Sequence, residues 1–397
     1  GDTYREHQNI AVQTVTKPWR EGSTMHLPAL PAIRAAEHPT APALSDEVES
    51  LDNAAFSARV AAAARALLAA GAGRGSVVAV ILPNSAAMVV SLFALWRIGA
   101  VVSPVNPNLA EPEVRFQLAD AGAVVVISDG AHAHLVGDPS ITVLTELAGG
   151  ASDVALPDAA ALPTDAGALL IYTSGTTGRP KGVMLSHDNL LAMSGMLIGE
   201  LELTAADRAL LVLPLFHANA ILLSTLSPLR AGGSMVIAKR FEPGAFLELV
   251  QRVRPTYFSG VPTVYSMLVT HPDAAACDFS SLRFAVCGAA PATQELLAEF
   301  ERLAAVPIIE GYGLSEGTCA SAINPLRGPR KPGSVGRIID GQRIRIVDED
   351  GTNVAAGEPG EVQIAGPNVM LGYLGRPEDT AATIVDGWLR TGDVGVL

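Results

Sequence analysis

One short segment carries most of the side chains suited to holding an anion. From Thr173 to Lys181 the sequence reads Thr-Ser-Gly-Thr-Thr-Gly-Arg-Pro-Lys, which crowds hydroxyls, glycines and one lysine together. Glycine lets backbone N–H groups turn toward an anion, hydroxyls add hydrogen-bond donors, and the lysine adds a point charge. A flexible linker is the other interpretation, but a linker has no need of Pro-Lys-Gly and is seldom flanked by buried strands. The segment therefore predicts a phosphate-binding loop.

This loop differs from the common loop of P-loop NTPases. That loop has a longer spacing between its glycines and ends in Lys-Ser or Lys-Thr. Here two residues separate Gly175 from Gly178, and Lys181 is followed by Gly182. The expected chemistry is phosphate binding with another loop geometry.

Alternating helices and strands must position the loop. Amphipathic or Ala-rich helices are expected at residues 53–71, 85–98 and 111–121. The expected strands are short apolar runs bounded by Gly, Pro or Asn, at residues 77–82, 100–102, 123–127, 168–172, 182–185, 208–213, 234–237, 257–260, 284–287 and 307–310. Buried strands that alternate with helices are typical of a mostly parallel α/β sheet. From about residue 337 helices become scarce, and residues 342–347 and 360–365 are expected to form a β-hairpin around a turn at 348–351.

The fold class expected from this pattern is α/β, with two packed, mostly parallel α/β subdomains and a smaller β-rich subdomain. The expected units are a polar leader or arm at residues 1–24, an α/β subdomain at 25–165, an α/β subdomain with the phosphate loop at 166–336, and the β-rich subdomain at 337–397. Residues 138–165, rich in Ala, Pro and Asp, are expected to be a surface connection. Residues 1–24 are either a native arm or an artificial leader.

Composition excludes several classes of protein. Hydrophobic residues make up 49% of the 397 residues, which is enough for a large core, so global disorder is excluded. No apolar run reaches the roughly 18 residues needed to span a bilayer. With 27 basic and 40 acidic residues the net charge is −13, so nucleic acid is not an expected partner. The three cysteines include no Cys-x-x-Cys pair, and they favour buried thiols in the cytoplasm.

The chain resembles the adenylate-forming superfamily of acyl-CoA synthetases, peptide-synthetase adenylation domains and beetle luciferases. Thr173–Lys181 is similar to the phosphate-loop signature of that superfamily, and the other matching motifs follow in the order of the family at Leu213–His217, Cys287–Pro291, Glu310–Glu316, Lys331–Gly336 and Thr391–Asp393. The resemblance covers nearly the whole chain after about residue 25, and it implies the large N-terminal domain of such an enzyme.

The resemblance implies a reaction in two steps. A carboxylate attacks the α-phosphate of ATP with Mg²⁺, pyrophosphate leaves, and a thiol then displaces AMP from the acyl-adenylate. The implied cofactors are ATP and Mg²⁺, with CoA as co-substrate. The residues that the resemblance assigns to the chemistry are Thr173, Lys181, Ser315 and Glu316, of which Thr173 and Glu316 would hold the metal. Those assigned to the phosphates are Thr173, Ser174, Gly175, Thr176, Thr177, Gly178 and Lys181.

The same resemblance assigns a nucleoside site and an acid pocket. The adenine and ribose residues are Gly288, Ala289, Ala290, Pro291, Glu310, Gly311, Tyr312, Gly313 and Asp393, with Tyr312 stacking on adenine and Asp393 accepting from the ribose hydroxyls. The two glycines after Glu310 are expected to permit close approach of the nucleotide. The acid-pocket residues are His217, Ala218, Asn219, Ser259, Gly260, Val261, Gly288 and Leu314. His217 is expected beside the substrate and not as a base, because a carboxylate is already ionised at neutral pH. Asn219 would either recognise a substituent or cap the next helix.

Several alternatives stay open at this point. The acceptor is CoA, a carrier-protein thiol or an amine, and the acid is fatty, aryl or inorganic, as with nitrite in diazotase relatives. A non-catalytic nucleotide-binding module is a further alternative. The family continues into a C-terminal lid domain that these residues do not contain, so we expect a truncated ligase that binds nucleotide but is poorly active alone. Oligomeric state cannot be read from the sequence.

Overall fold

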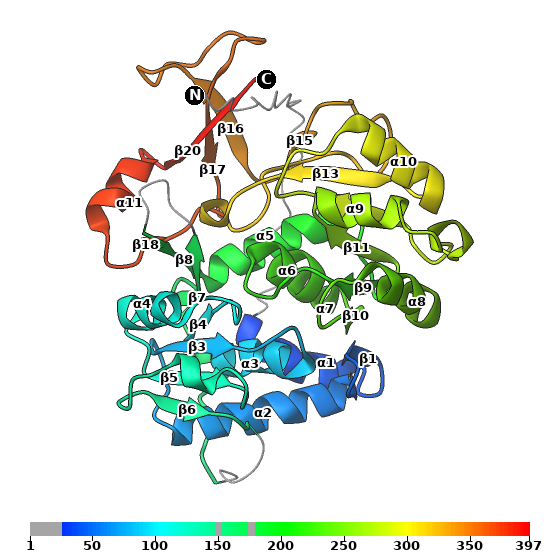
Figure 1. Ribbon diagram of the computed structural model, residues 1–397. Coiled ribbons are helices and arrows are strands. Elements are labelled where there is room, and N and C mark those ends of the chain that lie inside the picture. The colour runs from blue at the N-terminus through cyan, green and yellow to red at the C-terminus, as the bar shows by residue number, and fades with distance from the viewer. Residues whose placement is uncertain (1–25, 148–152, 174–178) are drawn as a thin grey trace.

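The computed structural model describes residues 26–147, 153–173 and 179–397, and its strands form three sheets (Figure 1). A seven-stranded sheet has the order β18-β8-β7-β4-β3-β5-β6, a nine-stranded sheet has the order β15-β14-β13-β12-β11-β9-β10-β1-β2, and a four-stranded sheet has the order β16-β17-β20-β19. The first two are mostly parallel with helices packed on them, and the third is antiparallel. This arrangement confirms the predicted fold class.

The seven-stranded sheet is parallel at its centre and antiparallel at the edge that carries the loop. Its strands are β3 (Val77–Ile81), β4 (Val101–Pro104), β5 (Val125–Ser128), β6 (Thr142–Leu144), β7 (Gly167–Thr173), β8 (Lys181–Ser186) and β18 (Gly372–Tyr373). Its helices are α2 (Asn53–Ala69), α3 (Ala86–Arg97) and α4 (Glu111–Ala121). The side chains of Asp52 and Ser85 accept from Ala55 N and Met88 N and so cap α2 and α3. Residues 138–165 are not only a connection, as predicted, because β6 pairs with β5 in parallel.

The nine-stranded sheet supplies the carboxyl ends of parallel strands at which the site is built. Its strands are β1 (Pro42–Ser45), β2 (Ser50–Asp52), β9 (Arg208–Leu211), β10 (Ser234–Ile237), β11 (Tyr257–Gly260), β12 (Phe284–Cys287), β13 (Ile308–Tyr312), β14 (Ala322–Ile323) and β15 (Arg337–Ile338). One face packs against α8 (Pro243–Val253), α9 (Pro262–Val269) and α10 (Gln294–Ala304). The opposite face shares one large apolar core with the seven-stranded sheet, which includes α5 (His187–Glu200), α6 (Ala218–Ile221), the π-helical η4 (Leu222–Leu226) and α7 (Ser227–Arg230).

The four-stranded sheet follows the others along the chain. It contains β16 (Arg343–Val347), β17 (Gly360–Ala365), β19 (Ile384–Val385) and β20 (Trp388–Gly395), and α11 (Pro377–Thr383) connects it to β18. The predicted hairpin exists, since β16 and β17 pair antiparallel, but its loop runs from 348 to 359 and not only through the expected turn. The short elements that remain are α1 (Leu30–Glu37), η1 (Leu27–Ala29), η2 (Ala133–Leu135), η3 (Ala159–Ala161), η5 (Ala274–Ala276) and η6 (Ser315–Gly317).

Sheet membership does not follow the order of the chain. β1 and β2 precede the seven-stranded sheet in sequence but belong to the nine-stranded one, where β1 pairs with β10. β7 and β8 lie beyond residue 165 yet complete the seven-stranded sheet. Sheet membership thus does not follow the boundaries expected at residues 165 and 336. The division of the chain into folding units at these residues stays a prediction. Among the described residues, no helix is long and apolar enough to cross a membrane.

A buried arginine ties the first helix to the nine-stranded sheet. The Arg34 side chain, only 5% exposed, donates to Asn53 Oδ1 at 2.8 Å and to Gly233 O at 2.8 Å, and it also reaches Leu229 O. Burial lowers the pKa of Arg34 to about 10, which leaves the guanidinium charged at neutral pH. These bonds connect α1, α2 and the turn before β10.

Candidate active site

The two ends of the predicted phosphate loop are held together by a hairpin. β7 and β8 are antiparallel, and Thr173 is the Cα partner of Lys181 across them. The predicted phosphate ligands between these ends, Ser174, Gly175, Thr176, Thr177 and Gly178, lie outside the described residues. Their roles stay predictions, while the hairpin places Thr173 and Lys181 opposite each other at the base of the loop.

Lys181 is paired with a carboxylate and lies on an aromatic ring. Its Nζ is 3.2 Å from Asp379 Oδ2 of α11 and 5.0 Å from the centroid of the Tyr373 ring. A cation over a tyrosine face is attracted by the electron-rich ring. With a side chain only 18% exposed, the ammonium is partly withdrawn from water and held by both contacts.

Tyr373 connects this lysine to the carboxylate that was expected to hold a metal. Its hydroxyl donates to Glu316 Oε1 at 2.9 Å, and Glu316 is further fixed by Met370 N, which donates to Glu316 O at 2.9 Å. Burial raises the pKa of Tyr373, as do the charge of Glu316 and this hydrogen bond, so the phenol stays a neutral donor. Lys181, Tyr373 and Glu316 therefore form one continuous group from β8, β18 and η6.

Sequence reasoning missed Tyr373 and Asp379. Both lie outside the motifs quoted above, and neither residue type is unusual in a short strand or in the first turn of a helix. The pairing of β18 with β8, which aligns Tyr373 with Val183, is what brings Tyr373 and the helix that follows it beside Lys181.

The donor set at Glu316 fits a magnesium ion bound together with a nucleotide. Magnesium in such sites keeps several waters and uses one or two protein oxygens plus phosphate oxygens. The described residues contain no cluster of three or more His, Cys, Asp and Glu side chains suited to a metal. A single carboxylate with the Thr173 hydroxyl would hold the ion only with phosphates present, which agrees with the predicted role of these residues.

A second pair joins the predicted adenine and ribose residues. The Tyr312 hydroxyl donates to Asp393 Oδ2 at 2.7 Å, linking β13 to β20 across 81 residues of chain. Burial raises the pKa of Tyr312, and the hydrogen bond to Asp393 raises it further. Asp393 is exposed, so its carboxylate is free to accept from a ligand as well.

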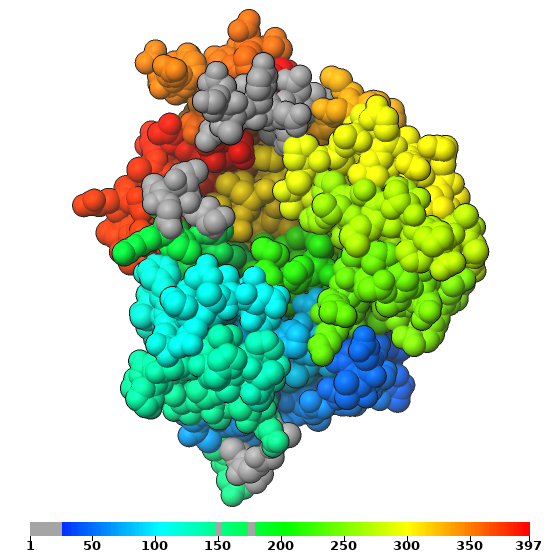
Figure 2. Space-filling model, in the orientation of Figure 1, coloured from blue at the N-terminus to red at the C-terminus, as the bar shows by residue number. Residues whose placement is uncertain are grey.

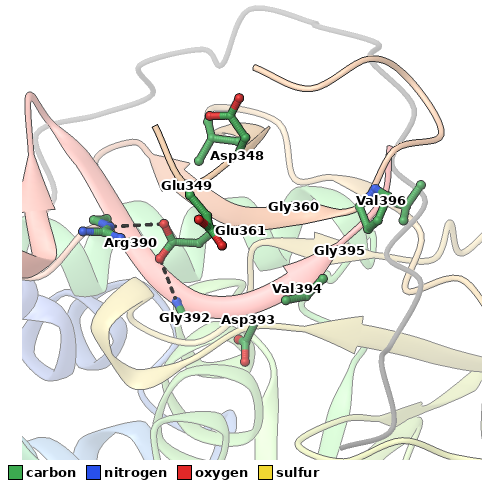
Figure 3. A pocket seen from close by; sticks show the side chains of 12 residues that line it. Asp348, Glu349, Gly360, Glu361, Arg390, Gly392, Asp393, Val394, Gly395 and Val396 are labelled. Carbon is green, nitrogen blue, oxygen red and sulfur yellow. Dashed lines mark hydrogen bonds and ion pairs between the residues drawn. The ribbon is translucent and has the colours of Figure 1, made fainter. Parts of the chain in front are cut away.

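A cavity of about 760 Å³ borders this pair on the four-stranded sheet (Figure 3). It is lined by Val347, Asp348, Glu349, Pro359, Gly360, Glu361, Arg390, Gly392, Asp393, Val394, Gly395 and Val396. Glu361 pairs with Arg390 at 3.1 Å, and in Figure 3 the Asp393 side chain points away from this ion pair. This cavity therefore touches the site at Asp393, and its lining does not include Lys181 or Glu316.

Residues 310–318 connect the Tyr312–Asp393 pair to Glu316, and a backbone hydrogen bond holds the end of this segment. Ser315 opens η6 and its carbonyl oxygen accepts from Thr318 N at 2.9 Å, while Glu310 and Leu314 are half-buried. Burial raises the pKa of Glu310, and a hydrogen bond with Gln294 opposes that shift. In Figure 2 the surface is hollowed between the C-terminal segment, drawn red, and the yellow segment that carries α10.

The structure requires glycine at Gly313 but not at Gly311. A Cβ on Gly313 would overlap the carbonyl oxygen of Cys319, so the close approach that requires glycine is to the protein backbone. A Cβ on Gly311 would lie 3.5 Å from Ala322 O, which is ordinary contact. The expectation that both glycines make room for a nucleotide therefore lacks structural support at Gly313.

The remaining residues predicted to bind adenine and ribose lie at the ends of neighbouring strands. Gly288 N donates to Gly260 O at 3.3 Å, and Cys287 is the Cα partner of Glu310, so the ends of β11, β12 and β13 lie side by side. The exposed turn Ala289–Pro291 continues from β12, with Ala289 in the left-handed region at φ 67°. Ligands of open α/β sheets bind at such carboxyl ends.

The predicted acid pocket contains buried polar atoms without partners. Asn219 is the second residue of α6, whose N-cap is His217, so the capping interpretation of Asn219 is wrong. Asn219 Oδ1 and Ser259 Oγ are buried, and neither has a hydrogen-bond partner among the described residues. A buried unpaired oxygen costs free energy, so both atoms would gain from a ligand.

The two oxygens come from α6 and β11, and β11 is bonded to η4, which continues α6. The Tyr257 hydroxyl donates to Leu223 O at 2.8 Å, which fixes β11 against η4. Ser259 follows Tyr257 on the same face of the strand, and Asn219 precedes Leu223 by one turn of helix. Of the other predicted pocket residues, Ala218 is buried, Val261 is the N-cap residue of α9, and His217 is exposed with its ring 4.6 Å from that of Phe216.

Comparison with known proteins identifies the family. The family model for AMP-binding enzymes matches residues 32–374. The chain belongs to the AMP-binding enzyme family. This confirms the resemblance predicted from the motifs.

Relatives of this AMP-binding enzyme are CoA ligases. It is 38% identical to a feruloyl-CoA synthase of Amycolatopsis sp. over 371 residues, covering 92% of the chain and 75% of the relative. It is 34% identical to 4-coumarate–CoA ligase 2 of Oryza sativa subsp. japonica, covering 92% of the chain and 71% of the relative. The crystal structure of ATP-bound MatB from Rhodopseudomonas palustris matches with a TM-score of 0.85 at 30% identity, over 93% of this chain and 76% of that one.

Proposed function

We propose that this AMP-binding enzyme uses ATP to convert a carboxylic acid to an acyl-adenylate, with release of pyrophosphate, and transfers the acyl group to CoA. The observation that carries the proposal is the group of Lys181, Tyr373 and Glu316, which joins the base of the phosphate loop to a carboxylate suited to magnesium. Family membership and relatives named as CoA ligases support both half-reactions.

The residues present address the main obstacle of the first step. A carboxylate and a triphosphate are both anions, so the site must neutralise charge and hold the reacting atoms in line. Lys181 would bind the phosphates, and Thr173 and Glu316 would hold magnesium, which neutralises phosphate charge when bound. Tyr312 and Asp393 would hold the nucleoside, so that the α-phosphate lies at the end of β11–β13. No proton needs to be removed from the acid, since it is ionised at neutral pH.

The acid pocket favours a substrate with a hydrogen-bond donor at its far end. Asn219 Oδ1 accepts only, and Ser259 Oγ both donates and accepts. A hydroxyl on an aryl acid would satisfy both, whereas a plain alkyl chain would leave them unpaired. The feruloyl and 4-coumarate relatives are named for hydroxylated aryl acids, which supports this class.

The test is acid-dependent release of pyrophosphate from ATP with Mg²⁺. A panel of hydroxylated and unhydroxylated aryl acids, fatty acids and nitrite separates the acid classes, and the Glu316→Ala variant controls for contaminating ATPases. We expect release with hydroxylated aryl acids to exceed that with their unhydroxylated counterparts by tenfold or more. Equal release with both, or preference for nitrite, contradicts the proposed acid class.

The acceptor is tested in the same reaction. Formation of an acyl-CoA thioester on adding CoA supports the proposed ligase, whereas transfer only to a carrier-protein thiol or an amine contradicts it.

The three cysteines are free thiols, which supports the proposed cytoplasmic location.

A further inference from the structure

Tyr373 contacts both residues that the proposed function assigns to phosphate and metal. Its ring lies under the Lys181 ammonium, 5.0 Å from centroid to Nζ, and its hydroxyl donates to Glu316 Oε1 at 2.9 Å. The two contacts use different parts of one side chain. A single rigid ring therefore fixes the relative position of a cation and an anion that come from distant segments.

Tyr373 is itself held in place by backbone bonds on both sides. It belongs to β18, which pairs with β8 so that Tyr373 faces Val183. Leu374 N donates to Gly182 O at 2.8 Å, next to Lys181, and Tyr373 N donates to Thr380 Oγ1 at 2.9 Å. The ring is thus held at a fixed place on the strand that carries Lys181. Its hydroxyl, which donates to Glu316 Oε1, holds Glu316 relative to that strand.

We propose that Tyr373 is a positioning residue that holds Glu316 toward magnesium and Lys181 toward the phosphates of the same bound ATP. This inference rests on the proposed function. An unoriented carboxylate must lose its rotational freedom when the metal binds, and the hydroxyl of Tyr373 removes that cost in advance. Oε1 of Glu316 accepts from the phenol, so Oε2 would be the oxygen available to hold the ion.

Two substitutions separate the two contacts. Tyr373→Phe removes the hydroxyl and keeps the ring under Lys181. Tyr373→Leu removes both the hydroxyl and the ring. The hydroxyl contact should affect only the part of ATP affinity that depends on magnesium, and the ring contact should affect ATP affinity with or without the metal.

The experiment measures ATP binding by calorimetry, with excess Mg²⁺ and with EDTA. We expect Tyr373→Phe to reduce the gain in affinity that Mg²⁺ provides by about tenfold, with affinity in EDTA unchanged. Tyr373→Leu should in addition weaken binding in EDTA by a few fold. In a Glu316→Ala background the Phe substitution should have no further effect on the magnesium gain, because its partner is gone.

A matched control is available in the same sheet. The Tyr172 hydroxyl donates to Asp120 Oδ2 at 2.8 Å, which is the same kind of bond at a carboxylate outside the candidate residues. Tyr172→Phe should leave the magnesium gain unchanged, and thermal unfolding of each variant shows whether the fold is intact.

The outcomes distinguish the inference from the proposed function. If the parent chain binds no ATP in either buffer, the proposed function fails and the inference fails with it. If the parent binds ATP with a magnesium gain but Tyr373→Phe weakens binding equally in both buffers, only the inference is overturned. The inference is likewise overturned if the Phe substitution reduces the magnesium gain equally with Glu316 or Ala at position 316.

Discussion

The ion pair between Lys181 and Asp379 predicts that one substitution will strengthen ATP binding. The two charged atoms are 3.2 Å apart, with side chains 18% and 41% exposed, and Arg376 Nη1 lies 3.8 Å from the same Asp379 oxygen. If Lys181 binds the phosphates of ATP, as proposed, these must displace Asp379 from the ammonium, so Asp379 would compete with the ligand. Asp379→Asn removes the competing charge and nearly preserves the shape of the side chain.

The magnitude follows from the distance and the exposure. At 3.2 Å the bare attraction is about 5 kcal/mol for an effective dielectric constant of about 20. Solvent screening and the ordering of two side chains reduce measured values for such accessible pairs to about 0.2–1 kcal/mol. The screened range of about 0.2–1 kcal/mol applies to this pair because the Asp379 side chain is 41% exposed. We therefore expect ATP to bind roughly 2–5-fold more tightly to the variant, with a loss of at most about 1 kcal/mol in stability.

Calorimetric titration with ATP in low salt measures this change, and Glu378→Gln is the matched control. Glu378 is the exposed neighbour in the first turn of α11, and its loss lowers the same local negative charge. We expect the control to change ATP affinity by much less than Asp379→Asn, and the effect at Asp379 to shrink as salt increases. Unchanged or weaker ATP binding by Asp379→Asn, or an equal gain in the control, would refute the competition.

Three further predictions concern the frame of the site. Gly313→Ala should weaken ATP binding by tenfold or more in the same titration, because its Cβ would displace the backbone of Cys319, whereas Gly311→Ala should have a much smaller effect. Arg34→Met should lower the free energy of unfolding in urea by about 3 kcal/mol, because it leaves several buried carbonyl oxygens without donors; a loss below about 1 kcal/mol would contradict this. Burial, together with a nearby histidine, lowers the pKa of His187 to about 4, so the unfolded chain binds a proton between pH 6.5 and 4 that the folded chain does not. The free energy of unfolding should therefore fall by about 3 kcal/mol as the pH is lowered from 6.5 to 4. The His187→Gln variant should lose this part of the pH dependence, and urea unfolding at several pH values measures it.

Local pattern was sufficient to predict the central strands of both large sheets. Helix 111–121 and strands 234–237, 257–260 and 284–287 match the structure residue for residue, because each is a short apolar or amphipathic run bounded by Gly, Pro or Asn. β6 was missed because its three residues, Thr142–Leu144, are too short for a periodic signal and gain their structure from pairing with β5.

The site shows a different limit of sequence reasoning. Motif resemblance named Lys181, Glu316, Tyr312 and Asp393, and the structure arranges them in two groups: Lys181 lies over the Tyr373 ring whose hydroxyl donates to Glu316, and Tyr312 donates to Asp393. It could not name Tyr373, whose importance arises only from the register of β18 on β8. The reason for Gly313 was also hidden, since the backbone that crowds it belongs to a turn later in the chain.

The late arrival of β18 has a consequence for the newly made chain. β8 ends at Ser186, but the strand that covers its outer edge begins at Gly372, so a growing polypeptide must carry an open sheet edge until the residues of β18 have been synthesised. An uncovered edge strand is a template for pairing with other chains. Fragments that end before Gly372 should therefore self-associate during expression, and a chaperone that shields this edge would favour the soluble product.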